Sequence, residues 1–443
     1  MSGTAACVDI GSTYTKAALV DLATGDLLAT AQAATTLDDV VTGVLAATAG
    51  FADAPVIACS SAGGGLRLAV VGYEELISAE AGHRAALSAG ARVVHVAAGR
   101  LDDAALATLA DVAPDVVLLV GGTDGGEASV LWHNAAALAS SAPLQGPSAS
   151  ARVLGGSGVL RRSVPVVLAG NVAVRDQVAA VLRNGGLPVR EADNVLPDIG
   201  RLAPESARTA IREVFLEHVI GGDRLSTDPR LRQWVRAVTP DAVLSGVTAV
   251  ARELSRARVS VVAVDVGGAT TDVYCVPDPD AEQASLGREA VGVPAQRRTV
   301  EGDLGVSWSV DALRAAATAE GLPDPGDEPL AQAEAAATVA LRRHLRAEAA
   351  YGPGGASARS AGLVLLSGGV FRHGDPDDVG RAAARLAADA GGAGSVIDAR
   401  PLIVDRRYVL AAVGLLAVEH PEASAGLARS LLRSAGTVTP FAG

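Results

Sequence analysis

The sequence predicts an α/β protein with two related lobes and a further α/β segment inserted in its first half. Three observations support this prediction. Short apolar strands alternate with helical patterns, one strand–turn–strand pattern occurs twice, and a strand–helix unit repeats between the two copies. We assign residues 1–60 and 200–255 to the first lobe, 61–199 to the inserted segment and 256–443 to the second lobe.

The order of elements follows from apolar runs and turn residues. In the first lobe, residues 6–9 and 16–21 are expected strands around a tight turn, 27–33 a third strand, and 38–49 a helix between Asp38 and Gly50. The inserted segment has expected strands at 93–97, 116–120 and 164–169, helices at 79–89, 103–109, 129–139 and 175–182, and a loop at 142–158. A helical zone at 206–254 and a strand–turn–strand at 259–276 follow, then an Ala-rich helix between loops at 321–329 and 352–357.

Composition argues against several classes of protein. A formal net charge of −12 over 443 residues does not suit a protein that binds nucleic-acid phosphates through a basic face. No apolar run reaches the roughly 18 uncharged residues of a membrane span, and the N-terminus shows no basic, apolar leader. We therefore expect a cytoplasmic protein without a membrane or nucleic-acid partner. Cys7, Cys59 and Cys275 share no metal-ligand spacing.

The repeated pattern is "VDIGSTYTKAA" (Val8–Ala18) and "VDVGGATTDVY" (Val264–Tyr274). In each copy an apolar strand ends in aspartate, Asp9 or Asp265, and the two aspartates lie 256 residues apart (265 − 9). Glycine and small hydroxyl residues follow, which let backbone N–H groups and hydroxyls reach phosphate oxygens. The carboxylates would hold a hydrated Mg²⁺ that bridges to the phosphates. The repeat therefore predicts a polyphosphate held from two sides.

At these residues the chain resembles the actin-like ATPase superfamily of sugar kinases, actin and large heat-shock chaperones. The resemblance implies two ribonuclease H-like lobes that close on ATP or ADP with Mg²⁺. "LVLLSGGVF" (Leu363–Phe371) resembles the adenosine motif, and "RRYVLAAVGLLA" (Arg406–Ala417) resembles a helix packed between lobes, with Gly414 allowing close approach. The implied nucleotide-binding residues are Gly11, Ser12, Thr13, Tyr14, Gly267, Gly268, Thr270, Thr271, Ser367, Gly368 and Gly369, and the implied metal-binding residues are Asp9, Asp265 and Asp272.

Lys16 is the one lysine in a chain with 36 arginines. An ammonium is a compact charge on a flexible stem, whereas a guanidinium is a planar fork that a narrow turn around a terminal phosphate would exclude. We expect Lys16 to contact phosphate and to act with Asp9 and Asp265 in catalysis. The alternative is a solvated strand residue.

A closer resemblance involves four further segments: residues 59–99, 114–127, 166–171 and 300–309. They resemble the MutL/GlmL family, whose genes accompany glutamate mutase and related adenosylcobalamin-dependent mutases, and which is unrelated to the mismatch-repair protein of similar name. The resemblance implies an ATPase that acts as a chaperone or reactivating factor for such a mutase. It does not imply an oligomeric state.

Two groups of polar residues can each be interpreted in two ways. Thr123, Asp124, Glu127 and Asn171 form either turns and helix caps or a second binding surface. The carboxylates of Glu301 and Asp303 either face nucleotide or metal, or cap a helix that starts near Ser307.

Two other functions also remain open from the sequence. A small-molecule kinase of the same superfamily would need a carboxylate base, which no motif identifies. A reductive activator with an iron–sulfur cluster would need thiolates at a subunit interface, whereas Cys7 and Cys275 lie in predicted strands.

Overall fold

The computed structural model divides into two units, residues 1–64 with 225–443 and residues 65–224. The expected helix at 79–89 lies almost wholly outside the described residues, and the loops at 142–158 and 352–357 lie wholly outside them. The structure describes residues 3–36, 38–51, 54–62, 66–73, 82, 86, 91–141, 164–199, 201, 203–220, 225–254, 260–276, 297–349, 361–389 and 402–434.

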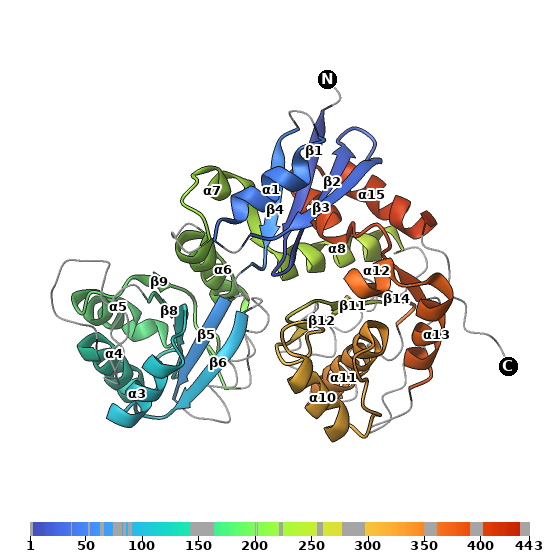
Figure 1. Ribbon diagram of the computed structural model, residues 1–443. Coiled ribbons are helices and arrows are strands. Elements are labelled where there is room, and N and C mark those ends of the chain that lie inside the picture. The colour runs from blue at the N-terminus through green and yellow to red at the C-terminus, as the bar shows by residue number, and fades with distance from the viewer. Residues whose placement is uncertain are drawn as a thin grey trace. The chain divides into compact units, whose positions relative to one another are not determined.

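The first sheet of the larger unit has the strand order β10-β4-β1-β2-β3 (Figure 1). β1 pairs antiparallel with β2 and parallel with β4, β2 pairs antiparallel with β3, and β4 pairs parallel with β10. The strands are β1 (Thr4–Ile10), β2 (Tyr14–Asp21), β3 (Leu27–Ala34), β4 (Val56–Ser60) and β10 (Val235–Val238). Helix α1 (Val40–Thr48) packs on β2 and β3, and Asp39 rather than Asp38 caps it.

The second sheet repeats this topology, with the order β13-β12-β11-β14-β15. β11 pairs antiparallel with β12 and parallel with β14, β12 pairs antiparallel with β13, and β14 pairs parallel with β15. The strands are β11 (Val261–Val266), β12 (Thr271–Val276), β13 (Arg297–Glu301), β14 (Leu363–Ser367) and β15 (Leu402–Val404). Two lobes of one topology therefore make up this unit, as the repeated sequence pattern predicts.

Helices connect the lobes into one core. Alternate residues of β11, such as Val261 and Ala263, pack in a cluster that also contains first-sheet residues and helices α8 (Thr239–Glu253), α14 (Leu410–Leu416) and α15 (Pro421–Ser434). The intervening residues Val262 and Val264 face the other side of the sheet. The helices on that side are α10 (Val310–Ala319), α11 (Pro329–Ala349), α12 (Gly369–His373) and α13 (Pro376–Ala387). Figure 1 shows α8 between the two sheets.

Helices α8 and α14 cross with their backbones in contact. A Cβ built on Gly414 would lie 1.7 Å from the carbonyl oxygen of Ala242, and one built on Gly246 would lie 2.1 Å from that of Leu410. Any side chain at either position would collide with backbone, so only glycine fits there. The close helix approach expected at Gly414 is confirmed.

The smaller unit is a parallel sheet with the strand order β6-β5-β7-β8-β9. Nearly every residue of its central strands is buried, as in sheets covered on both faces. Its strands are β5 (Leu66–Gly72), β6 (Ala91–Ala98), β7 (Val116–Leu119), β8 (Val166–Leu168) and β9 (Val189–Glu191). Its helices are α3 (Asp103–Asp111), α4 (Ser129–Ser141), η1 (Val172–Val174), α5 (Arg175–Asn184), α6 (Glu205–Val214) and η2 (Phe215–Ile220).

The boundaries of the inserted segment differ from those expected. We assigned residues 200–255 to the first lobe, but α6 packs on β7, β8 and β9, and the first lobe resumes only at Leu225 with the short helix α7 (Arg230–Trp234). The insertion therefore connects β4 to β10, whereas α12 and α13 connect the equivalent strands β14 and β15 of the second lobe. Across the described ranges, none of the helices combines the length and apolar character that a bilayer span requires.

Candidate functional site

The two repeated turns have the same hydrogen bond. The N–H of Gly11 donates to the carbonyl of Tyr14 at 3.1 Å, and the N–H of Gly267 donates to that of Thr270 at 2.9 Å. Each bond closes a two-residue loop between antiparallel strands, Ser12–Thr13 in the first lobe and Gly268–Ala269 in the second. The sequence repeat is thus also a repeat of backbone geometry.

The two turns lie against one another. A Cβ built on Gly268 would be 2.8 Å from Oγ1 of Thr13. Trp308 connects them, because its backbone N–H donates to the carbonyl of Gly268 at 2.8 Å and its indole Nε1 donates to Thr13 Oγ1 at 3.3 Å. The structure therefore brings both predicted phosphate motifs to one place, beside Trp308, a residue that is 66% exposed.

Asp9 is buried, with 4% of its surface exposed, and contacts four donors. Its Oδ1 accepts from Oγ1 of Thr239 at 2.6 Å and from Sγ of Cys59 at 3.6 Å. Its Oδ2 accepts from the hydroxyl of Tyr408 at 3.0 Å and lies 3.5 Å from Nζ of Lys16. A carboxylate has about four acceptor positions, so Asp9 could coordinate a metal directly only by losing one of these partners.

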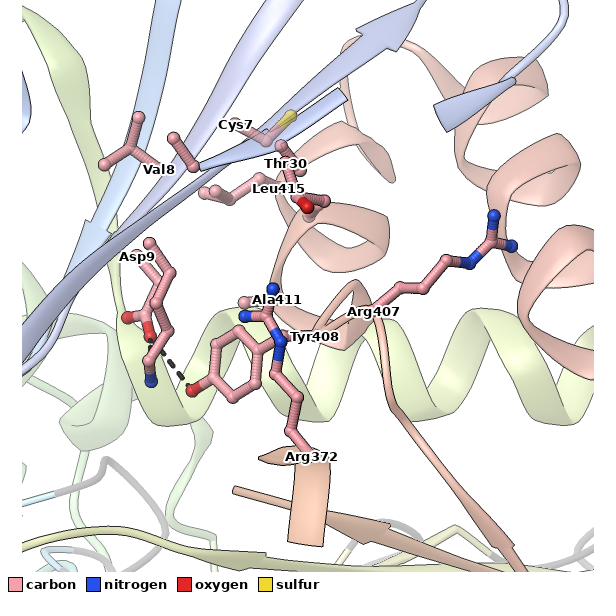
Figure 2. A pocket seen from close by; sticks show the side chains of 13 residues that line it. Cys7, Val8, Asp9, Thr30, Arg372, Arg407, Tyr408, Ala411 and Leu415 are labelled. Atoms are coloured by element: carbon pink, nitrogen blue, oxygen red, sulfur yellow. Dashed lines mark hydrogen bonds and ion pairs between the residues drawn. The ribbon is translucent and has the colours of Figure 1, made fainter. Parts of the chain in front are cut away.

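Lys16 lies directly opposite Asp9 in the β1–β2 register. Its Nζ is 3.7 Å from the centre of the Tyr408 ring and 4.0 Å from a Cβ built on Gly11. Figure 2 shows Tyr408 directed at Asp9 in a pocket that Arg372 and Arg407 also line. Lys16 is therefore held beside the first turn by an ion pair and a cation–π contact, and it is not the solvated strand residue of the alternative.

Asp265 and Asp272 form the corresponding pair in the second lobe, directly opposite one another on β11 and β12. Within the described part of the chain, Oδ1 of Asp272 is buried without a hydrogen-bond partner, while Oδ2 accepts from Thr270 Oγ1 at 3.2 Å. Burial raises the pKa of Asp272 to about 7, helped by the neighbouring charges of Asp265 and Glu301 and opposed by Arg298 and Thr270. Two adjacent carboxylates with an unfilled acceptor are suited to a cation.

Asp265 also faces the first lobe. Burial raises its pKa and the Asp9 carboxylate adds to this, whereas Lys16 and a hydrogen bond from Ser367 lower it. No three His, Cys, Asp or Glu side chains form a ready metal site among the residues described. Mg²⁺ commonly takes one or two carboxylates and completes its shell with water and phosphate, so Asp265 and Asp272 fit that ion better than Asp9 does.

The predicted adenosine motif lies beside this pair. Ser367 is opposite Asp265 in the β11–β14 register. Gly368 has φ +118° and a Cβ there would be 2.2 Å from the carbonyl oxygen of Val266, so only glycine fits. Gly369 begins α12, and Arg372 of that helix reaches the pocket of Lys16.

Sequence reasoning missed Thr239 and Arg372. It identified the segment around Tyr408 but not the contact between that tyrosine and Asp9.

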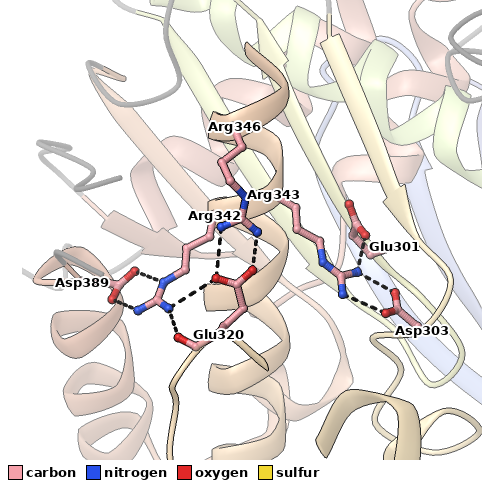
Figure 3. Close-up of polar contacts among 7 residues, drawn as sticks. All are labelled: Glu301, Asp303, Glu320, Arg342, Arg343, Arg346 and Asp389. Carbon is pink, nitrogen blue, oxygen red and sulfur yellow. Dashed lines mark hydrogen bonds and ion pairs between the residues drawn. The ribbon is translucent and has the colours of Figure 1, made fainter. Parts of the chain in front are cut away.

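The carboxylates of Glu301 and Asp303 both contact Arg343, and neither caps helix α10. Arg343 of α11 donates to Oε2 of Glu301 at 2.7 Å and to both carboxylate oxygens of Asp303 at 2.8 and 2.9 Å (Figure 3). Helix α10 begins at Val310 without a side-chain cap. Both carboxylates therefore tie the end of β13 to α11.

The polar residues of the inserted unit serve turns and caps. Asp124 Oδ1 accepts from the N–H of Val172 at 3.1 Å and from Asn194 at 2.8 Å, and Asn171 accepts from the N–H groups of Gly125 and Ala173, both at 3.0 Å. Glu127 accepts from the N–H of Ser129, the first residue of α4. Thr123 closes the turn through its carbonyl, which accepts from the N–H of Gly126 at 3.0 Å. The structure thus supports the first of the two interpretations, and nothing in these contacts indicates a second ligand.

Two lobes of this shared topology, with matched turns meeting at their junction, define a protein of the actin-like ATPase fold. The chain belongs to the MutL family. The family model for the MutL protein matches residues 5–330 and 325–432. The chain is 30% identical over 478 residues to Protein MutL of Clostridium tetanomorphum, with 96% of this chain and 98% of that protein covered.

Solved structures similar to this chain include three that are 10–12% identical in sequence. A nucleotide-free acetone carboxylase aligns over 94% of this chain and 70% of its own, with a TM-score of 0.38. Xylulose kinase from Bifidobacterium adolescentis aligns over 97% of this chain and 94% of its own, with a TM-score of 0.30. The ethanolamine utilization protein EutJ from Carboxydothermus hydrogenoformans aligns over 97% of this chain and 90% of its own, with a TM-score of 0.29. At scores this low, the fold assignment rests on the sheet topology and the family.

Proposed function

We propose that the protein binds ATP or ADP with Mg²⁺ at the junction of the two turns and hydrolyses ATP to ADP and phosphate. The observation that carries this proposal is the meeting of the two matched turns, with Lys16 on one side and the Asp265–Asp272 pair on the other. Phosphate oxygens need hydrogen-bond donors and a positive charge. The first turn supplies the donors, and the ammonium of Lys16 supplies the charge. Mg²⁺ held near Asp265 and Asp272 would neutralise the charge of the phosphates.

The further proposal is that nucleotide turnover serves a protein client, an adenosylcobalamin-dependent mutase of the glutamate mutase type. Membership of the MutL family supports this, given the mutase association that the resemblance implies. Two lobes around one nucleotide can differ in conformation between nucleotide states, and a client that binds one state better is then bound and released in turn. The protein would thereby act as a chaperone or reactivating factor that exchanges damaged cofactor for fresh, in the cytoplasm.

Calorimetry with ATP and ADP, with and without Mg²⁺, tests the nucleotide site. Absence of binding at millimolar nucleotide would contradict the proposal. Stimulation of ATP turnover by added sugars would favour a kinase instead.

The client is tested separately, by inactivating a cognate mutase with cyanocobalamin and adding this protein, ATP, Mg²⁺ and adenosylcobalamin. Recovery of mutase activity supports reactivation. If activity does not return and no nucleotide-sensitive complex forms, the client proposal fails while the nucleotide site stands.

The iron–sulfur alternative loses support from the structure. All three cysteines, Cys7, Cys59 and Cys275, are buried and none forms a disulfide. Burial raises the pKa of Cys7 to about 12. A thiolate ligand is therefore unfavourable at Cys7, and a colourless purified protein is expected.

A further inference from the structure

We propose that Tyr408 is a positioning residue for Lys16, which fixes the direction in which the lysine presents its ammonium to the nucleotide. This inference rests on the proposed function, because it takes the phosphate to be the partner of Lys16. It adds a residue 392 positions away in the chain (408 − 16) to the machinery of the first turn.

Two different parts of Tyr408 act on the Asp9–Lys16 pair. Its ring covers the ammonium, with Nζ 3.7 Å from the ring centre. Its hydroxyl donates to Oδ2 of Asp9 at 3.0 Å, the same oxygen that lies 3.5 Å from Nζ. The ring and the carboxylate therefore enclose the ammonium on two sides. The four-carbon stem of a lysine is flexible, so without these contacts the ammonium would sample many directions.

The ammonium lies close to the first turn of the proposed phosphate site. Nζ lies beside Gly11 of the first turn, and its charge lowers the pKa of Asp265 in the second lobe, against the larger effect of burial. The Lys16 side chain keeps 21% of its surface exposed although two sides are covered. An anion entering between the turns would meet an ammonium that is already directed at it, so little side-chain ordering remains to be done on binding.

The backbone of Tyr408 is tied to the start of α14. It has φ +52°, a left-handed conformation that is uncommon for a bulky residue, and its N–H donates to the carbonyl of Asp405 at 3.2 Å. The Asp405 carboxylate accepts from the N–H groups of Val409 and Leu410 at 2.7 and 3.0 Å and so fixes the start of α14. Backbone strain that the surroundings maintain is common at functional sites. The ring is therefore anchored to the helix that packs between the lobes.

Because Lys16 is the sole lysine, its position can be measured without reference to activity. Protein labelled with ¹³C,¹⁵N-lysine gives one Cε–Hε NMR signal. The Tyr408 ring should shift these protons upfield, Tyr408→Phe should keep most of that shift, and Tyr408→Leu should abolish it. A signal at the random-coil position in the wild-type protein would overturn the proposal.

Steady-state ATP hydrolysis then tests the functional role in a double-mutant cycle. Tyr408→Leu should lower kcat/KM by about 2- to 30-fold, the range of a cation–π contact, and Tyr408→Phe by less. In the Lys16→Ala background both substitutions should have a smaller effect, because only the hydrogen bond from the hydroxyl to Asp9 is then lost. Equal losses with and without Lys16 would show a merely structural role and overturn the proposal, with thermal melting as the check on folding.

The two levels of inference fail in different ways. If the wild-type protein binds no nucleotide, the proposed function is wrong and the positioning role falls with it, whatever the NMR signal shows. If nucleotide binds and turns over but the Tyr408 variants act independently of Lys16, only the positioning role is wrong.

Discussion

Lys16 and Asp272 occupy equivalent positions in the two repeated hairpins, separated by the same 256 residues (272 − 16) as Asp9 and Asp265. Each lies directly opposite its aspartate, Lys16 across from Asp9 and Asp272 across from Asp265. One hairpin thus carries an ion pair and the other a pair of carboxylates. A magnesium–polyphosphate complex offers both an anion and a cation, so the difference between the two copies matches the two ends of one ligand.

Lys16→Ala should reduce kcat/KM for ATP by about 10- to 150-fold, because a charge-assisted hydrogen bond contributes roughly 1.5–3 kcal/mol. Lys16→Arg should also impair turnover, since the space between Asp9 and the Tyr408 ring holds an ammonium. Steady-state kinetics measure both. Wild-type kinetics in Lys16→Ala would show that the lysine takes no part.

Asp265→Asn and Asp272→Asn should each raise the Mg²⁺ concentration needed for half-maximal hydrolysis, by about tenfold or more, because each removes a charge from the proposed cation site. Asp303→Asn is the matched control, since both carboxylate oxygens of Asp303 accept hydrogen bonds from Arg343. Titration of activity with Mg²⁺ distinguishes them. An equal effect in all three variants would contradict the assignment.

Deprotonation of the buried Asp405 carboxyl should make the free energy of unfolding fall as pH rises. Burial raises its pKa to about 6, the Asp265 charge adds to this, and the N–H groups of Leu410 and Val409 and the charge of Arg372 oppose it. The folded state then binds a proton more tightly than the unfolded chain, so this contribution is present below about pH 4 and is lost as pH rises through about 6. Asp405→Asn should flatten that part of the melting-temperature profile. An unchanged profile would show that folding does not shift the pKa of Asp405.

Trp308 should report nucleotide binding through its fluorescence, because the residue is exposed and its indole donates to Thr13 at the junction of the turns. ATP with Mg²⁺ should change the emission of the wild-type protein, and Trp308→Phe should remove that change. Trp132 and Trp234 remain in the variant and serve as internal controls. A change in emission that persists in Trp308→Phe would show that the signal arises from another tryptophan.

Gly414→Ala should destabilise the protein by at least about 1–3 kcal/mol, the cost of overpacking, because its Cβ would meet the backbone of α8 at 1.7 Å. Gly50→Ala is the control, since a Cβ there meets nothing within 4 Å. Denaturant unfolding compares the two. Equal free energies of unfolding for the two variants would show that α8 and α14 can move apart without loss of stability.

The local parts of the site could be predicted from sequence. The turns at Gly11 and Gly267 follow from an apolar strand, an aspartate and a glycine in consecutive positions, and the burial of Cys7 and Cys275 follows from their apolar neighbours. Gly414 was identified by its place in a helix that resembles a known motif. These features depend on residues close together in the chain.

The partners of Asp9 could not be predicted, because Thr239 and Tyr408 lie 230 and 399 residues away and arrive with helices α8 and α14. Arg343 likewise reaches Asp303 from 40 residues further along the chain. The order of charged residues along the chain does not reveal which arginine will pair with which carboxylate. The helical pattern of α6 similarly does not reveal which sheet it covers, and this accounts for the boundary that was misplaced.

The place of residues 65–224 has an evolutionary consequence. That unit lies within one crossover, between β4 and β10, which are adjacent and parallel, while the sister lobe makes the same crossover with two short helices. The crossover is thus a point where a gene could gain, lose or exchange a whole module without altering Asp9, Lys16 or Asp265. Relatives with a different module there would keep the two matched turns and differ only in the inserted unit.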